Sequence, residues 1–416
     1  MPELPARPKL RPVEAFPIEE GGRRMFVMHD PAGLASGPIT ASPPTVFLLL
    51  LMDGTRSLDE VQAAFAEQIG QPVPRDELEN LVRQLDAAHY LAGESFEEHF
   101  RSLAAAYRAA PARTIRDLSA YGIDGSGRDP DPAGRLRKTL SQVLSQEGVS
   151  VEPRRGRLTG LVAPHLDYPR GGPCYAAAYG VLAAAQRPRR IVILGTNHYG
   201  RSASVVATHK DFQTPLGTTR TDRDFLDALQ ARCGADLCAH EFDHAREHSV
   251  ELQVLLLQHL LGADRFEMLA VLCPDPCGPT GTAPHNGEGV DLRIFAETLG
   301  ALVREDATPT LLIAGADLSH VGRRFGDARD LSGAFLQEVE LLDRAALVQC
   351  IGGEPEAFIT TLAERDNSTR MCSAGCLYAL RTALDGAEGE LLRYHQAVDA
   401  AADICVTCCA AAFWEK

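Results

Sequence analysis

Three apolar runs in the sequence each lead into a histidine. Buried strands of a parallel α/β sheet have this pattern, and ligands bind just beyond the carboxyl ends of such strands. Imidazole is the commonest ligand for transition metals in proteins. We therefore expect one polar, metal-competent site where the three runs end. The runs and their histidines are Leu161–Ala163 with His165, Ile191–Gly195 with His198, and Leu311–Ala316 with His320.

Two further residues could complete such a site. Asp317 stands three residues before His320 and could form an acid–base pair with it, or fix the tautomer of a metal-bound histidine. A turn cap is the alternative role for an Asp after a strand. Cys372 follows a polar stretch and opens a predicted helix, whose N-terminus would favour a metal-binding or reactive thiolate. The alternative for Cys372 is a small side chain buried at a helix start.

A competing motif overlaps the start of the next expected helix, 247–261. The stretch from His244 to His248 matches H-x-x-E-H, in which two histidines bind zinc and the glutamate is the base of a metallopeptidase. That chemistry needs both histidines within a helix, whereas His244 comes where the helix should begin. His248 and Glu251 are expected on one helical face under either interpretation.

From residue 158 onward, apolar runs alternate with amphipathic stretches. This alternation is typical of an α/β domain in which a mostly parallel sheet is flanked by helices on both faces. The expected strands are 159–163, 191–195, 203–207, 267–272 and 310–316. The expected helices are 174–186, 222–231, 247–261, 292–304, 331–349, 354–363 and 373–384. The last stretch, with Cys405, Cys408 and Cys409, is expected to be a buried strand.

The N-terminal part has a different pattern. Residues 1–20 are rich in proline and charge and are expected to be loose, and a strand is expected at Met25–His29. Short helices follow, one of them capped by Ser57. The stretches "LLLMDGTRSLDEV" and "LENLVRQLDAAHYL" resemble the small winged-helix domains of the PqqD type, which hold peptides. A helical appendage without a site is the alternative.

These patterns divide the chain into three parts. We expect a small α-rich, winged-helix-like module over 1–110, a linker over 111–134, and the metal-binding α/β domain over 135–416. The linker is placed there because Gly122–Gly134 is rich in Gly, Asp and Pro.

Composition excludes several classes of protein. The net charge of −15 and the lack of a basic stripe argue against a nucleic-acid partner. The apolar runs are far shorter than the roughly 20 residues of a membrane span. The chain opens without an apolar signal core, so we expect a cytoplasmic protein. Its cysteines are then expected to be reduced. Nucleotide binding and α/β-hydrolase chemistry lack their motifs.

Six blocks occur in a fixed order: "APHLDYPRGGPCYAAAY", "RRIVILGTNHYG", "FQTPLGTTRTD", "REHSVELQVLLLQ", "DLSHVGRRF" and "NSTRMCSAGCLYAL". In order and spacing they resemble the Memo proteins, whose bacterial members are called AmmeMemoRadiSam system protein B. The resemblance implies the fold of the class III extradiol dioxygenases, which use non-haem Fe(II). It also implies that His165, His198 and Cys372 bind the metal, that His320 is an acid–base residue, and that Asp317 and His248 line the cleft.

The sequence departs from the family pattern in three places. Asp167 stands in "APHLDY" where the family has "APHAGY", the stretch Asp117–Gly127 replaces an "AGSWY"-like block, and the N-terminal module is extra. We expect these departures to affect the substrate more than the metal. Asp167, Tyr199 and Glu251 are the residues expected to contact the substrate.

The resemblance implies an iron-dependent oxidoreductase acting on an unidentified small molecule or peptide, with copper as the second choice of metal and zinc below it. The alternative is a non-catalytic adaptor that binds a peptide or partners a radical-SAM protein. A zinc peptidase acting through His244 and His248 ranks last, because Glu247 and His248 recur in the family whereas His244 does not.

Overall fold

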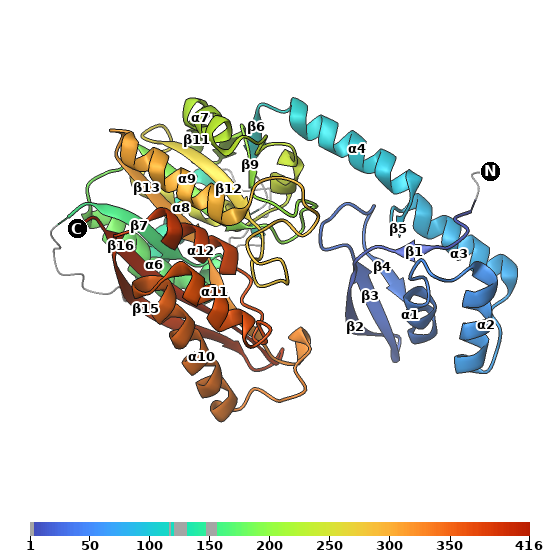
Figure 1. Ribbon diagram of the computed structural model, residues 1–416. Helices are drawn as coiled ribbons and strands as arrows, with labels where there is room; N and C mark the ends of the chain where they lie inside the picture. The colour runs from blue at the N-terminus through green and yellow to red at the C-terminus, as the bar shows by residue number, and fades with distance from the viewer. Residues whose placement is uncertain (1–3, 116–117, 120–130, 147–155) are drawn as a thin grey trace. The chain divides into compact units, whose positions relative to one another are not determined.

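A computed structural model describes residues 4–115, 118–119, 131–146 and 156–416 (Figure 1). The chain forms two compact units, Met1–Ala109 and Ala110–Lys416. Among the described residues, no helix has the length and apolar character needed to cross a bilayer.

The first unit contains a small antiparallel sheet and four helices. Strands β2 (Glu14–Glu20), β3 (Arg23–His29) and β4 (Ile39–Ala41) pair in that order, and β1 (Lys9–Leu10) pairs with β5 (Leu91–Ala92). The helices are α1 (Pro43–Leu50), α2 (Leu58–Ile69), α3 (Arg75–Ala87) and α4 (Glu94–Ala109). Ser57 caps α2 as predicted, because its side chain accepts from the Glu60 N–H and the Glu60 side chain accepts from the Ser57 N–H.

The expectation that residues 1–20 are loose is wrong for Lys9–Leu10 and Glu14–Glu20, which form β1 and β2. Phe16 and Ile18 are half-buried and alternate along β2 with the exposed residues Ala15, Pro17 and Glu19, so one face of this strand is partly covered while the other faces water. Antiparallel pairing with β3 then satisfies the backbone. The likeness to a winged-helix domain of the PqqD type stays a prediction.

The second unit is an α/β fold built on a large sheet. The strand order is β14-β16-β7-β13-β8-β12-β11-β10-β6, with β15 against β16 and β9 against β12. Five neighbouring strands at the centre of the sheet are parallel to one another: β7, β13, β8, β12 and β11. The strands are β6 (Ala112–Thr114), β7 (Leu158–Ala163), β8 (Arg190–Thr196), β9 (Val206–Ala207), β10 (Asp211–Thr214), β11 (Gly217–Thr221), β12 (Glu267–Cys273), β13 (Thr310–Gly315), β14 (Asp317–Val321), β15 (Glu388–Asp399) and β16 (Ile404–Trp414).

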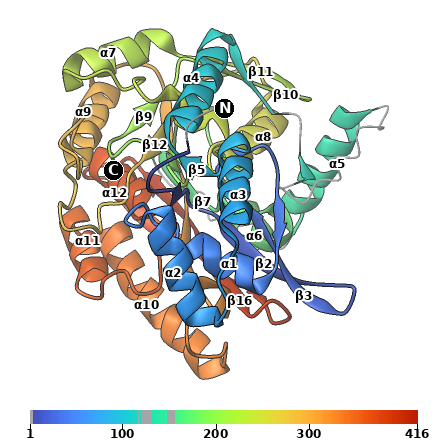
Figure 2. The ribbon, with the colours of Figure 1, turned by 90° about the vertical axis from the view of Figure 1, so that its right-hand side faces the viewer.

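Helices cover both faces of this sheet. Figure 2 shows α9 to α12 on one side and α5, α6 and α8 on the other. Strand β8 shows why both faces are apolar: Val192 and Leu194 pack into one core, whereas Ile191 and Ile193 pack into the other. The helices are α5 (Pro132–Leu144), α6 (Tyr168–Ala184), α7 (Arg223–Cys233), α8 (Glu251–Leu261), α9 (Leu292–Glu305), α10 (Gly333–Gly352), α11 (Pro355–Ala363) and α12 (Ala374–Ala383).

Two parts of the second unit differ from expectation. The expected linker 111–134 includes strand β6, which pairs with β10, and the start of α5. Its central part, including most of Asp117–Gly127, lies outside the described residues. The residues after β13 do not leave the sheet: Asp317–Val321 form β14, because β16 offers an antiparallel partner that lies far along the chain.

Candidate metal centre

The structure brings His165, His198 and Cys372 together. Strands β7 and β8 flank β13, so the loops that follow them, with His165 and His198, meet at the same edge of the sheet. Cys372 lies in the loop that precedes α12. One ligand atom from each of the three residues lies within 4.8 Å of the other two, and the Cys372 Sγ is 3.5 Å from the His165 Nε2. These are donors that a transition metal can use.

Asp317 fixes the position of His165. Its Oδ1 accepts the backbone N–H groups of His165 and Leu166, at 3.0 and 3.2 Å. The His165 Nδ1 lies 2.9 Å from the Gly315 carbonyl oxygen, which accepts its proton and leaves Nε2 directed at Cys372. Asp317 therefore holds a distant segment rather than capping a local turn.

Glu247 does the same for His198. Both carboxylate oxygens lie 3.1 Å from the His198 Nδ1. They also accept the backbone N–H groups of His198, His248 and Ser249, at 2.8 to 3.0 Å. A carboxylate on Nδ1 leaves Nε2 as the metal-binding atom and makes the imidazole a better ligand. Glu247 was not among the predicted site residues, although it stands in the "REHSVEL" block.

The charges of the three candidate ligands depend on one another. Burial alone would raise the pKa of the Cys372 thiol, but His165 and His198 hold it well below its usual range. Burial alone would lower the pKa of His165, but Asp317 and Cys372 raise it to about 9. These pKa shifts favour a Cys372 thiolate beside a protonated His165.

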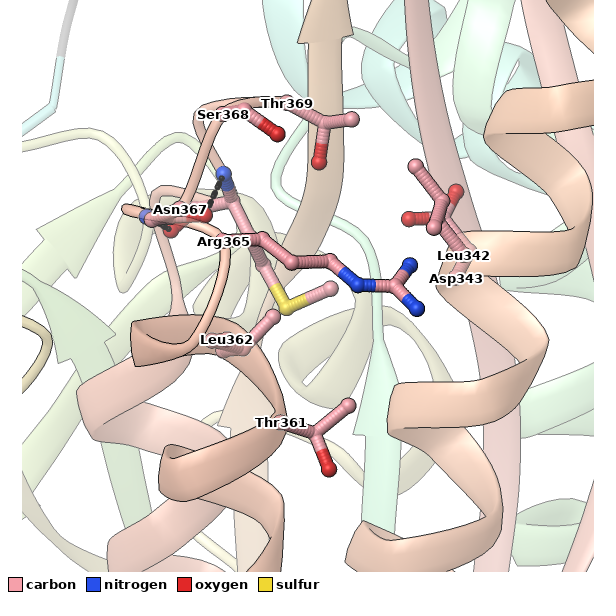
Figure 3. Close-up of a pocket in the computed structure, with 9 residues that line it drawn as sticks. Leu342, Asp343, Thr361, Leu362, Arg365, Asn367, Ser368 and Thr369 are labelled. Carbon is pink, nitrogen blue, oxygen red and sulfur yellow. Dashed lines mark hydrogen bonds between the residues drawn. The ribbon is translucent and has the colours of Figure 1, made fainter.

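The loop that carries Cys372 is tightly constrained. Asp366, Asn367 and Arg370 have positive φ values, of 52°, 45° and 57°, which residues other than glycine seldom adopt. The Asn367 side chain bridges to the backbone N–H and carbonyl of Met371, and Arg365 extends across a neighbouring pocket towards Asp343 (Figure 3). These contacts fix the backbone just before Cys372.

His248 lies against the two candidate histidine ligands, but it does not lie on α8. Its ring centroid is 4.9 Å from that of His198 and 5.4 Å from that of His165. The prediction that His248 shares a helical face with Glu251 is wrong. Glu247 uses its carboxylate to accept the N–H groups of the next two residues, so α8 begins only at Glu251. Burial lowers the pKa of His248 to about 4.

His320 is held beside the Cys372 loop. Its backbone N–H donates to the Thr369 carbonyl at 2.7 Å, and the Arg370 Nε donates to the His320 carbonyl at 2.9 Å. Its Nδ1 is 3.1 Å from the Leu318 carbonyl oxygen, and its ring packs edge-on against Phe325.

The three expected substrate residues have different surroundings. Asp167 is the N-cap of α6, where it accepts the Arg170 N–H at 3.1 Å and pairs with the Arg170 guanidinium. Tyr199 is 40% exposed, and its ring is 5.8 Å from that of His198. Glu251 is buried and forms an ion pair with Arg113 of β6.

His244 does not join His248. It lies in the 3₁₀ helix η2 (Glu241–Ala245), and its Nε2 is 2.9 Å from the Val206 carbonyl oxygen. Since residues 244–248 do not form one α-helix, the two histidines cannot share a face in the manner of the H-x-x-E-H peptidases.

Comparisons with known proteins agree on one family. Residues 129–412 match the family model of Memo-like proteins. A MEMO1 family protein of Aquifex aeolicus is 28% identical over 329 residues, which cover 77% of this chain and 77% of the relative. One of Methanopyrus kandleri is 32% identical, covering 59% and 79% of the two chains. One of Thermus thermophilus is 29% identical, covering 84% and 96%. The chain therefore belongs to the Memo family.

Proposed function

We propose that this chain is a non-haem iron-dependent oxidoreductase that acts on a small molecule or peptide in the manner of the extradiol dioxygenases. The observation that carries the proposal is the arrangement of His165, His198 and Cys372. Each histidine is held through its Nδ1 by a carbonyl or a carboxylate, and the Cys372 Sγ lies 3.5 Å from the His165 Nε2.

The donor set fits a divalent iron. Two imidazoles and a thiolate correspond to the two-histidine-one-carboxylate arrangement of non-haem iron enzymes, with cysteine in place of the carboxylate. The carboxylates of Asp317 and Glu247 are both buried next to the histidines and would offset the charge of the ion. When bound, Fe(II) supplies the one-electron and O₂ chemistry that side chains lack.

The remaining side chains would handle protons and substrate. His248, with its pKa of about 4, is neutral near pH 7, so it can accept a proton or a hydrogen bond next to the ligands. His320 is proposed to move a proton through its Nε2, since its Nδ1 faces the Leu318 carbonyl. Tyr199 is proposed to contact the substrate, because it is exposed and adjoins His198.

Metal analysis of the chain purified without oxygen tests the proposal. We expect about one Fe(II) per chain, lost in His198→Ala and Cys372→Ser, because each substitution removes one of the three proposed ligands. Cys277→Ser is the matched control, since Cys277 is also a partly buried cysteine but is not among the three clustered ligands. Equal iron in Cys372→Ser and Cys277→Ser would refute the assignment.

Oxygen uptake separates an enzyme from an adaptor. An iron-loaded chain that consumes O₂ with a candidate substrate, and stops doing so in His198→Ala, supports the oxidoreductase. A chain that binds Fe(II) but consumes no O₂ with a broad set of catechols and peptides favours the adaptor role. Preferential loading with Cu(I) would favour copper, which also suits a thiolate ligand.

A further inference from the structure

A second group of metal-binding side chains lies outside the centre described above. It consists of His209, Cys238 and Glu241, whose ligand atoms all lie within 4.8 Å of one another. His209 follows β9, Cys238 lies between α7 and η2, and Glu241 is the first residue of η2. We propose that this cluster binds a zinc ion, and that the ion holds η2 in place.

The backbone already holds the three segments against one another. The Ala207 N–H donates to the Leu237 carbonyl at 2.8 Å, next to both His209 and Cys238. The Glu241 N–H donates to the Cys238 carbonyl at 2.9 Å. The Glu241 Oε1 accepts the His209 N–H at 2.7 Å. The ligands are therefore carried on a fixed frame, so an ion would find them assembled and would need only small side-chain rotations.

The side chains are close enough for a small rotation to form a zinc site with a supporting carboxylate. The His209 Nδ1 is 3.9 Å from the Glu241 Oε1, whereas two ligands of one tetrahedral zinc ion are about 3.3 Å apart. On the opposite side of the ring, the His209 Nε2 is 3.8 Å from the Asp227 Oδ1. Nδ1 therefore faces the cluster and Asp227 can orient the ring, as carboxylates do for zinc-bound histidines.

The donor types and the local charge favour zinc. Imidazole, thiolate and carboxylate are the three ligand types that zinc uses, and a water molecule would complete a tetrahedral site. Glu241, Asp227 and Asp236 surround the cluster with carboxylates, and the Asp236 Oδ1 accepts the Cys238 N–H at 2.8 Å. Lys210, with its Nζ 3.7 Å from the Glu241 Oε2, balances only part of this charge.

The position of the cluster suggests what the ion would do. The chain segment that starts at Glu241 continues to Asp243, whose carboxylate accepts the N–H groups of Arg201 and Ser202 and the Asn197 side chain, all at 3.0 to 3.1 Å. It ends at Glu247, which orients His198. An ion at one end of this segment would therefore stabilise the loop that carries a ligand of the first centre.

Zinc and cobalt binding by the full chain tests the site in a Cys372→Ser background. This substitution removes the thiolate of the first centre, so a thiolate-to-cobalt band reports on Cys238 rather than on Cys372. We expect this variant to retain about one zinc per chain, because its three clustered donors remain. Co(II) should give a near-ultraviolet thiolate-to-cobalt band. Adding Cys238→Ser should abolish both the zinc and the band. Adding Cys233→Ser, at a partly buried cysteine outside the cluster, should change neither.

A third variant keeps the test independent of the cysteine. His209→Gln should weaken zinc binding at least about tenfold while the cobalt band persists at saturating cobalt, because the thiolate is still present. The site is refuted if the Cys372→Ser chain binds no zinc, or if it binds as much zinc with Cys238→Ser as with Cys233→Ser. Circular dichroism of each variant establishes that the chains compared are folded.

Discussion

Glu247→Gln tests how the first centre is held together. The Glu247 Oε2 accepts the His198 N–H, and its Oε1 accepts the N–H groups of His248 and Ser249. Glutamine replaces one acceptor oxygen with an amide NH₂, so at least one of these backbone donors loses its partner in either orientation. Leaving a buried donor unpaired costs about 1–3 kcal/mol, which is the expected loss in the free energy of unfolding.

The effect on metal binding can be separated from this loss of stability. Removing a carboxylate from a ligating histidine weakens metal binding about 10- to 100-fold. That factor corresponds to about 1.4–2.7 kcal/mol of binding free energy. The assay is a competition titration of Fe(II) against a chromophoric chelator, with unfolding by urea measured in parallel.

Asp222→Asn is the matched control. Asp222 is a buried carboxylate that pairs with Arg190 at 2.6 Å, at the opposite end of the strand that leads to His198. Its Oδ1 also accepts the Phe225 N–H as the cap of α7, so an asparagine amide must leave either this N–H or Arg190 without an acceptor, which should lower stability by a similar amount without changing metal affinity. If Glu247→Gln binds metal as tightly as Asp222→Asn does, the carboxylate does not position His198 and the reasoning fails.

Two further predictions follow from the same unit. Metal affinity should rise as the pH is raised from neutral. The pKa of His165 is raised to about 9 and that of His198 is raised well above its usual value, so both rings hold a proton near pH 7 that the metal must displace. Isothermal titration at several pH values should show proton release and a positive slope, and a flat profile would contradict a role for these two histidines as ligands. Thr407→Val should lower the free energy of unfolding by about 1–3 kcal/mol, because the buried Thr407 hydroxyl donates to Asp343 and accepts the Ser319 N–H. The free energy of unfolding in urea is compared with that of a control variant, Thr360→Val, which changes an exposed threonine on α11. Equal losses of stability in the two variants would contradict the prediction.

Part of this protein is determined by local sequence. The alternation of apolar runs and amphipathic stretches predicts the α/β unit, because strands buried on both faces need continuous apolar residues. The Ser57 cap is local as well, since its partner is three residues away. The strand-end histidines His165 and His198 could be found from the sequence, because the carboxyl ends of parallel strands meet at one edge.

Tertiary contacts decided the rest. Residues 317–321 form a strand because β16 pairs with them, and nothing near them in the sequence signals that partner. His248 is off the helix because Glu247 uses its carboxylate to accept the next two backbone N–H groups and to hold His198, which is 49 residues away in the sequence. The cluster of His209, Cys238 and Glu241 likewise could not be predicted from the spacing of its residues in the sequence. The hydrogen bond between Ala207 and Leu237 brings its segments together only in the folded chain. The sequence by itself determined which residue types were available, and only the folded chain decided which of them face one another.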